Sequence, residues 1–127
     1  MFAITPIYAI ILAALLLVLG AMVSIKRAKT GISIMHGDDM SLAESIRRHG
    51  NLAENAAVFL ILMALAEANG AGANWLHAAG IIFVVGRLMH PFGIEQGRVN
   101  APLRAVAALG NSIGMLVLIV AMALQMM

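Results

Sequence analysis

The sequence contains no cysteine, and only 11% of its 127 residues are charged. The absence of cysteine excludes disulfides, thiolate metal sites and cysteine nucleophiles. A soluble domain carries about 25% charged residues, so too few polar side chains remain here to cover a surface that faces water. The small net charge of +2 and the lack of a long basic run argue against a nucleic-acid partner.

Apolar residues make up 62% of the chain and give it a mean hydropathy of +0.97. A bilayer core about 30 Å thick is crossed by roughly 20 apolar residues in a helix. Four segments of the chain satisfy this requirement, and they predict one all-α integral membrane domain over residues 1–127, a bundle of four transmembrane helices. We expect the helices at residues 4–25, 41–68, 75–90 and 100–127.

Local signals set these boundaries. Ser41 and Glu44 have the spacing of a capping box, in which each side chain bonds a free backbone N–H of the first helical turn. Asn74 is a typical N-cap residue for the third segment. Pro91 disfavours helical geometry in the residue before it, so we expect the third helix to end there. Pro102 suits the first turn of the fourth helix, where its missing N–H does no harm.

The fourth segment also contains Gly110 and Gly114, a G-x-x-x-G pair that permits close contact with another helix. The chain contains 12 glycines, so two unrelated glycines would give the same spacing. The sequence leaves both interpretations open.

The basic residues are distributed unevenly over the predicted loops. Lys26, Arg27 and Lys29 follow the first apolar segment, Arg98 lies in the third loop, and Arg104 comes just after it. The amino terminus, the second loop and the carboxyl terminus contain no Lys or Arg. Because cytoplasmic loops carry the excess of basic residues, we expect loops one and three in the cytoplasm and both termini on the other side.

A polar stripe interrupts the second apolar segment. At about 100° per residue, Arg47, Asn51 and Glu54 fall on one helix face, with Arg48 and Asn55 beside it. An ionisable side chain within the hydrocarbon is costly, and it is by default a functional candidate. The alternative is an Arg47–Glu54 ion pair that only holds helices together.

The next two predicted helices add further polar residues. Arg87 and His90 lie three residues apart at the end of the third helix, and therefore on one face. Arg104 lies in the first turn of the fourth, where a cation opposes the helix dipole, although it could also snorkel to lipid phosphates. Together these residues predict a pocket near the cytoplasmic face for a small polyanion that also carries a cationic group.

The stretch Arg-Arg-His-Gly-Asn-Leu-Ala-Glu-Asn at residues 47–55 resembles the second-helix signature of the MAPEG family, the membrane-associated proteins in eicosanoid and glutathione metabolism. Residues 86–90 and 101–104 resemble that family's motifs at the end of its third helix and the start of its fourth. The four-helix layout, the chain length and the basic first loop also agree. The chain is most similar to the short bacterial branch of the family.

The resemblance implies a homotrimer in a bacterial inner membrane. The loop charges then place both termini in the periplasm, and we expect no metal site. The resemblance also implies a glutathione transferase or peroxidase activity on lipophilic electrophiles that arrive from the bilayer lipids. Glutathione, the co-substrate, would bind between subunits near the cytoplasmic face, and Arg104 would be the catalytic residue that stabilises its thiolate. The residues implied for glutathione binding are Arg47, Asn51, Glu54, Arg87, His90, Arg27 (or Lys26), Arg48 and Asn55.

This chain departs from the family pattern at two places. Characterised members have a tyrosine shortly after the third-helix motif, whereas residues 91–95 here read Pro-Phe-Gly-Ile-Glu. The usual proline after Glu54 is also missing. Two other classes of function therefore stay open. One is a membrane protein that binds glutathione or another small anion without turnover, and the other is a small transporter with Glu54 as its membrane-embedded carboxylate.

Overall fold

The computed structural model of the chain describes residues 2–93 and 102–127, including all their side chains except those of residues 103 and 104. Each of its four helices contains a stretch that is long and apolar enough to cross a membrane. This confirms the all-α architecture predicted from hydropathy. The fourth helix was expected from residue 100 with Pro102 in its first turn, and in the structure it begins at Pro102. The helices are α1 (Thr5–Thr30), α2 (Met40–Ala68), α3 (Ala73–Gly93) and α4 (Pro102–Gln125).

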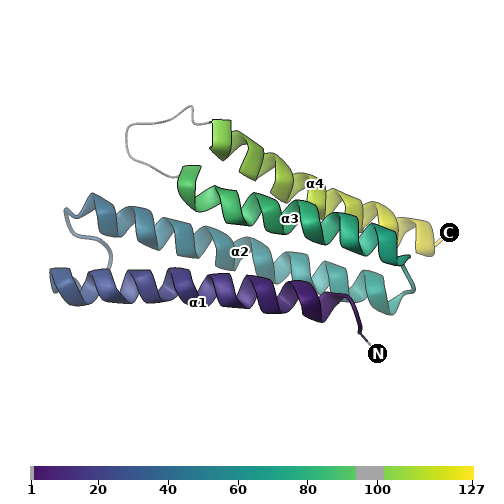
Figure 1. The fold of residues 1–127 in the computed structure, drawn as a ribbon, viewed down its shortest axis with the longest axis horizontal. Helices are drawn as coiled ribbons and strands as arrows, with labels where there is room; N and C mark the ends of the chain where they lie inside the picture. Colours follow the sequence, from purple (N-terminus) through teal and green to yellow (C-terminus); the bar gives the residue numbers. More distant parts are fainter. Residues whose placement is uncertain (1, 94–101) are drawn as a thin grey trace.

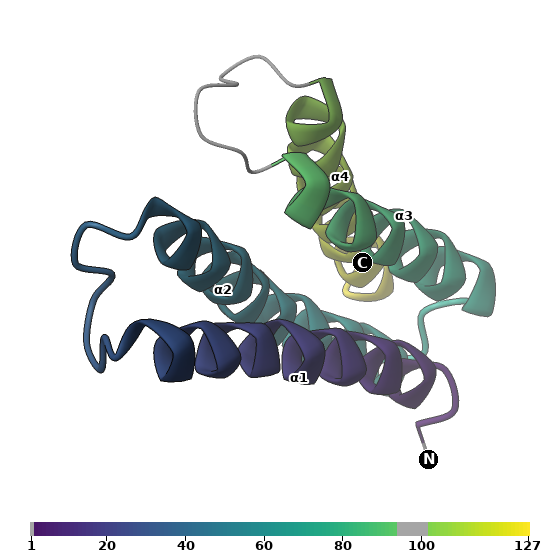
Figure 2. The ribbon, with the colours of Figure 1, turned by 60° about the vertical axis from the view of Figure 1, so that its left-hand side comes forward.

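The helices form two antiparallel hairpins, α1 with α2 and α3 with α4 (Figure 1). Packing is most extensive within the hairpins. Between the hairpins, α2 contacts both α3 and α4, whereas α1 contacts α3 but not α4 among the described residues. Figure 2 shows the two hairpins as separate layers. The α1–α2 loop and the last turn of α3 lie at one end of the bundle, and both termini lie at the other (Figure 1).

Helix α1 is longer than predicted, because it continues past the apolar run until a glycine C-cap ends it. The backbone of Gly31 is left-handed, with φ of 71°, and its N–H donates to the carbonyl of Arg27 at 2.9 Å. The helix therefore runs to Thr30 rather than ending at Ile25. Its last turn includes Arg27 and Lys29, where the helix dipole favours cations.

The capping box predicted for the start of α2 is wrong. The helix begins at Met40, and its N-cap is Asp39, whose carboxylate accepts the backbone N–H of Leu42 at 2.9 Å. The hydroxyl and carbonyl oxygens of Ser41 instead accept hydrogen bonds from Nζ of Lys26, at 2.6 and 2.8 Å. Asp39 and Ser41 are both good N-cap residues, and tertiary contacts with α1 decide between them.

Helix α3 differs from its prediction at both ends. It begins at Ala73, so Asn74 lies in its first turn and is not the N-cap. It also continues past His90 to Gly93, with Pro91 inside the helix. Since Pro91 lies so close to the end, its missing N–H removes one helical hydrogen bond, and the final turn persists.

Glycines bring α3 and α4 into close contact. A Cβ atom built on Gly86 would lie 3.4 Å from Cα of Gly110, and one built on Gly114 would lie 3.0 Å from Cβ of Phe83. A Cβ atom built on Gly110 would lie 3.2 Å from the carbonyl oxygen of Ile82, so neither Gly110 nor Gly114 has free room for a side chain. The G-x-x-x-G pair therefore makes a close helix contact within one chain, which settles the choice that the sequence left open.

The core lies between the hairpins. Phe59 of α2 and Phe83 of α3 are fully buried and stack with their ring centroids 3.8 Å apart. Large apolar side chains on the outer faces, such as Ile10 and Leu17 of α1, are 70% and 76% exposed. An outer surface of this kind suits lipid, not water.

Two polar contacts join the helices at the end that holds the termini. Glu67 of α2 accepts backbone N–H groups of residues 3–5 at 2.6–2.8 Å and so satisfies donors that have no partner within α1. The hydroxyl of Tyr8 lies 2.9 Å from Nδ1 of His77, and the Tyr8 ring occupies the space beside Gly80 that any side chain would need. At this end of the bundle, α1 is therefore held to both α2 and α3 by polar contacts within the chain.

Candidate functional site

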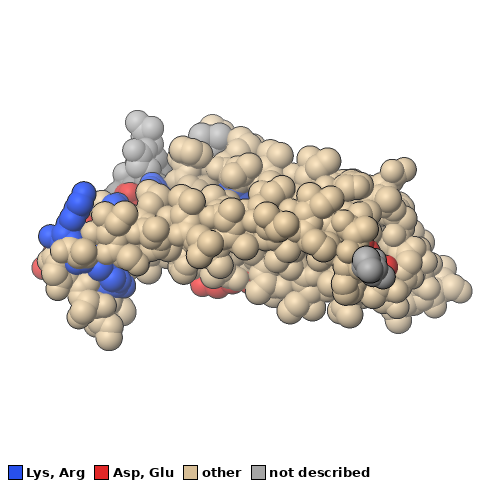
Figure 3. All heavy atoms as spheres, turned by 60° about the horizontal axis from the view of Figure 1, so that its bottom comes forward, with Lys and Arg blue, Asp and Glu red and all other residues tan. Residues whose placement is uncertain are grey.

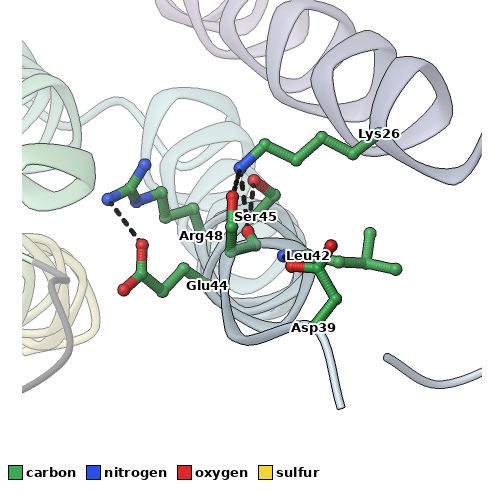
Figure 4. A network of polar contacts seen from close by, with 7 residues as sticks. Lys26, Asp39, Leu42, Glu44, Ser45 and Arg48 are labelled. Carbon is green, nitrogen blue, oxygen red and sulfur yellow. Dashed lines mark hydrogen bonds and ion pairs between the residues drawn. The ribbon is translucent and has the colours of Figure 1, made fainter. Parts of the chain in front are cut away.

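Lysine and arginine gather at the opposite end of the bundle, around the α1–α2 loop (Figure 3). Lys26 reaches across to the first turn of α2 (Figure 4). Arg27 donates from Nη1 to the carbonyl oxygens of Ile32 and Met35 at 3.1 and 3.0 Å. The resemblance implied one of these two basic side chains as a glutathione ligand. In the structure Arg27 bonds the loop itself, and Lys26 bonds the helix turn that follows it.

Arg48 lies one turn beyond Glu44 on α2. Its Nη2 atom is 3.5 Å from Oε2 of Glu44, and the two side chains are 21% and 23% exposed. Figure 4 shows this pair pointing away from Lys26, toward the side on which α3 and α4 lie. The structure thus separates Arg48 from the basic residues that hold the loop.

Arg48 also lines a groove between α1 and α3 with a volume of about 430 Å³. All other side chains of this groove are apolar, so it suits a lipophilic molecule that enters from the bilayer. The groove is lined by Leu15, Val18, Leu19, Met22, Arg48, Leu88, Pro91 and Phe92.

Arg47 and Glu54 form an ion pair on the outer surface of α2. Nη1 of Arg47 lies 3.6 Å from Oε1 of Glu54, and the side chains are 63% and 61% exposed. Glu54 lies about halfway along the 29-residue helix, roughly 20 Å from its start at 1.5 Å per residue. Two charges at this depth would be costly if they faced lipid.

Asn51 lies between these two residues in sequence but faces inward. Its Oδ1 atom accepts a hydrogen bond from Nη1 of Arg87 on α3 at 2.6 Å. Arg87 is only 3% exposed, and its guanidinium carbon lies 5.3 Å from the centre of the Phe83 ring. No ion pair links Arg87 to a carboxylate of the described residues. Among the described residues, this buried cation therefore contacts two neutral groups, the Asn51 amide and the Phe83 ring.

A second amide contact extends this polar cluster to α4. The side-chain Nδ2 of Asn55 donates to the carbonyl of Asn51 at 2.8 Å, and Oδ1 of Asn55 accepts from Nδ2 of Asn111 at 3.1 Å. Asn111 was not among the predicted site residues, although an amide within an apolar run seven residues after Arg104 was a usable signal. Three helices thus meet through neighbouring polar side chains.

The structure brings together only some of the predicted site residues. His90 is buried one turn after Arg87 on α3. Arg104 lies in the first turn of α4, and its side chain lies outside the described residues. Within the described residues, no group of three or more His, Asp or Glu side chains is arranged to hold a metal ion.

Four apolar helices with a polar cluster at their junction define a helical membrane protein. The MAPEG family model matches residues 5–124, and the chain belongs to that family. It is 33% identical over 93 residues to "Inner membrane protein YecN" of Escherichia coli strain K12 and equally to that of Escherichia coli O6:H1, strain CFT073. Each alignment covers 73% of this chain and 71% of the relative. No solved structure matches the chain significantly.

Proposed function

We propose that this protein is a glutathione-dependent transferase or peroxidase that acts on lipophilic electrophiles, and that it works as a homotrimer with its sites between subunits. Family membership and the name of its relatives support a place in the bacterial inner membrane. The uneven distribution of Lys and Arg supports periplasmic termini and a cytoplasmic site.

The exposed Arg47–Glu54 pair carries this proposal. The pair lies on the surface of α2, with Glu54 about halfway along the helix and more than half of each side chain uncovered. A neighbouring subunit that covers this face would remove the charges from lipid. The same arrangement would place a cation and an anion side by side in an intersubunit pocket.

Such a pocket matches the chemistry of glutathione. The γ-glutamyl end of the peptide carries a carboxylate and an ammonium group on one carbon, complementary to Arg47 and Glu54 respectively. Its second carboxylate requires another cation, which Arg87 or Arg48 would supply. The groove between α1 and α3 gives a lipophilic electrophile an apolar place near Arg48.

The reaction requires the thiolate of glutathione. We assign its stabilisation to Arg104, because a fixed cation nearby lowers the pKa of a thiol and a guanidinium remains charged throughout. The thiol proton leaves to solvent. The sulfur then forms a bond to the electrophilic carbon while the bond from that carbon to its leaving group breaks.

Calorimetric titration of the detergent-purified protein with glutathione tests binding, and far-ultraviolet absorbance of the bound thiol tests ionisation. We expect saturable binding, a thiolate signal at neutral pH, and a mass of three chains in native mass spectrometry. Binding without ionisation would favour the non-catalytic alternative, in keeping with the missing third-helix tyrosine. Absence of binding would refute the proposal, and a monomer that binds glutathione would refute the intersubunit site.

A further inference from the structure

We propose that Asn111 is a positioning residue for Arg104. By bonding Asn55, it fixes the rotation and height of α4 against α2, and so sets where Arg104 stands relative to bound glutathione. This inference rests on the function proposed above, and it adds a residue that touches neither glutathione nor the electrophile.

The hydrogen bonds form a continuous link across three helices. Asn111 of α4 donates to Asn55 of α2 at 3.1 Å, and Asn55 in turn donates to the backbone of Asn51 at 2.8 Å. Asn51 accepts from the buried guanidinium of Arg87 on α3 at 2.6 Å. The position of α4 is therefore tied to Asn51 and Arg87, two residues that the family resemblance implies for glutathione binding.

Asn111 also lies beside a close contact between α3 and α4. A Cβ atom on Gly86 would lie 3.5 Å from the backbone nitrogen of Asn111 and 3.4 Å from Cα of Gly110. Glycine contacts let two helices approach but carry little directional preference, because they present smooth backbone to one another. The hydrogen bond from Asn111 to Asn55, which joins α4 to α2 beside this contact, supplies the missing direction, since it weakens steeply when its angle changes.

The spacing on α4 means that a small tilt of this helix at the contact changes the position of residue 104. Positions 104 and 111 are seven residues apart, so they lie about 20° from one another around the helix and roughly 10 Å apart along it. A 10° tilt about the contact would therefore move position 104 by roughly 2 Å. Misplacement of about 1 Å in an active site can lower a rate by roughly 100-fold.

Three variants test the assignment. Asn111→Ala removes the amide, and Asn111→Gln keeps an amide on a longer side chain. Ser112→Ala is the matched control, because Ser112 is the next residue on α4 and is exposed. For each we would measure kcat and KM for glutathione, the pH profile of thiolate absorbance, and the α2–α4 distance. The chain has no native cysteine, so spin labels can be attached at Ala57→Cys and Ala108→Cys alone. Pulsed electron paramagnetic resonance then measures the α2–α4 distance between them. The samples contain no glutathione and are diluted with unlabelled protein.

In Asn111→Ala we expect kcat to fall by about tenfold or more, with KM for glutathione within about twofold of wild type. The thiolate profile should move to higher pH, the α2–α4 distance should shift or broaden, and Asn111→Gln should recover part of each change. Ser112→Ala should behave as wild type. If Asn111→Ala does not fold, the same measurements on Asn111→Gln and Asn111→Ser are compared with those of the wild-type protein.

A wild-type thiolate profile, kcat and distance in Asn111→Ala would overturn the proposal. Equal losses of folded protein and activity with an unchanged thiolate profile would also overturn it, because they would show a structural role alone. If the wild-type protein itself fails to bind or ionise glutathione, the proposed function fails separately. The α2–α4 distance then decides the positioning claim, and an unchanged distance in Asn111→Ala refutes it.

Discussion

The substitution Glu54→Gln tests whether the Arg47–Glu54 ion pair binds glutathione or is only an exposed ion pair on the surface of α2. It keeps the size of the side chain and removes its charge. Within one subunit the Arg47–Glu54 pair spans 3.6 Å, and both side chains are more than 60% exposed. An exposed pair of this kind contributes about 0–1 kcal/mol. If a second subunit and glutathione cover the pair, the loss of the Glu54 charge would instead cost about 2–5 kcal/mol of binding free energy, because the charge of Arg47 stays buried.

These two ranges predict different changes in affinity. A loss of 2 kcal/mol weakens glutathione binding by roughly 30-fold, whereas 1 kcal/mol weakens it by roughly fivefold. Isothermal titration of detergent-purified wild-type and Glu54→Gln protein measures the difference directly. Glu44→Gln is the matched control, since Glu44 pairs with Arg48 at 3.5 Å on the same helix. Native mass spectrometry of both variants shows whether the trimer survives.

We expect a loss of at least roughly 30-fold in Glu54→Gln and a much smaller change in Glu44→Gln. A loss below about fivefold in an intact trimer would refute our reasoning, because the pair would then behave as an ordinary exposed ion pair. Equal losses in the two variants would also refute it, since the effect would not be specific to the outer face of α2.

Three further predictions concern catalysis, packing and topology. Arg104→Ala should lower the thiolate fraction and turnover at neutral pH but leave glutathione affinity unchanged at low pH, and an unaltered thiolate absorbance would contradict the assigned role. Gly110→Val should destabilise the α3–α4 contact by about 1–3 kcal/mol, whereas Ala108→Val on the exposed face should leave the melting temperature in detergent nearly unchanged. A reporter active only in the cytoplasm should be silent when fused after Met127, and a strong signal would reverse the proposed topology.

Hydropathy alone was sufficient to predict four helices, because crossing a bilayer imposes a length and a composition that this sequence meets four times. It was insufficient for the helix ends, where neighbouring residues compete for the same role. Asp39 and Ser41 can each cap α2, and the contact between Lys26 and Ser41 favours Asp39 as the cap. Likewise, α1 continues past its apolar run as far as the C-cap at Gly31, a signal that hydropathy does not register.

The polar stripe of α2 shows a similar limit for the site. Helical periodicity correctly grouped Arg47, Asn51 and Glu54 within one arc, but it could not locate the edge of the packed interior. That edge runs through the stripe, so Asn51 faces Arg87 while Arg47 and Glu54 remain outside. Asn111 was missed for a related reason. A single amide in an apolar helix has no spacing pattern, and its partner on α2 becomes visible only when the hairpins are packed together.

The surroundings of Arg87 bear on whether this cluster is only structural. Its guanidinium is 3% exposed and meets the amide of Asn51 and the ring of Phe83, both of them neutral. The described part of the chain pairs no carboxylate with Arg87. Burying a charge without a counter-charge costs several kcal/mol, and a neutral side chain could link α2 to α3 through the same amide at lower cost. The presence of a cation here is therefore poorly explained by packing alone. A bound anion that reaches Arg87 from the side of Asn51 would offset this cost, and the carboxylates of glutathione have the required charge.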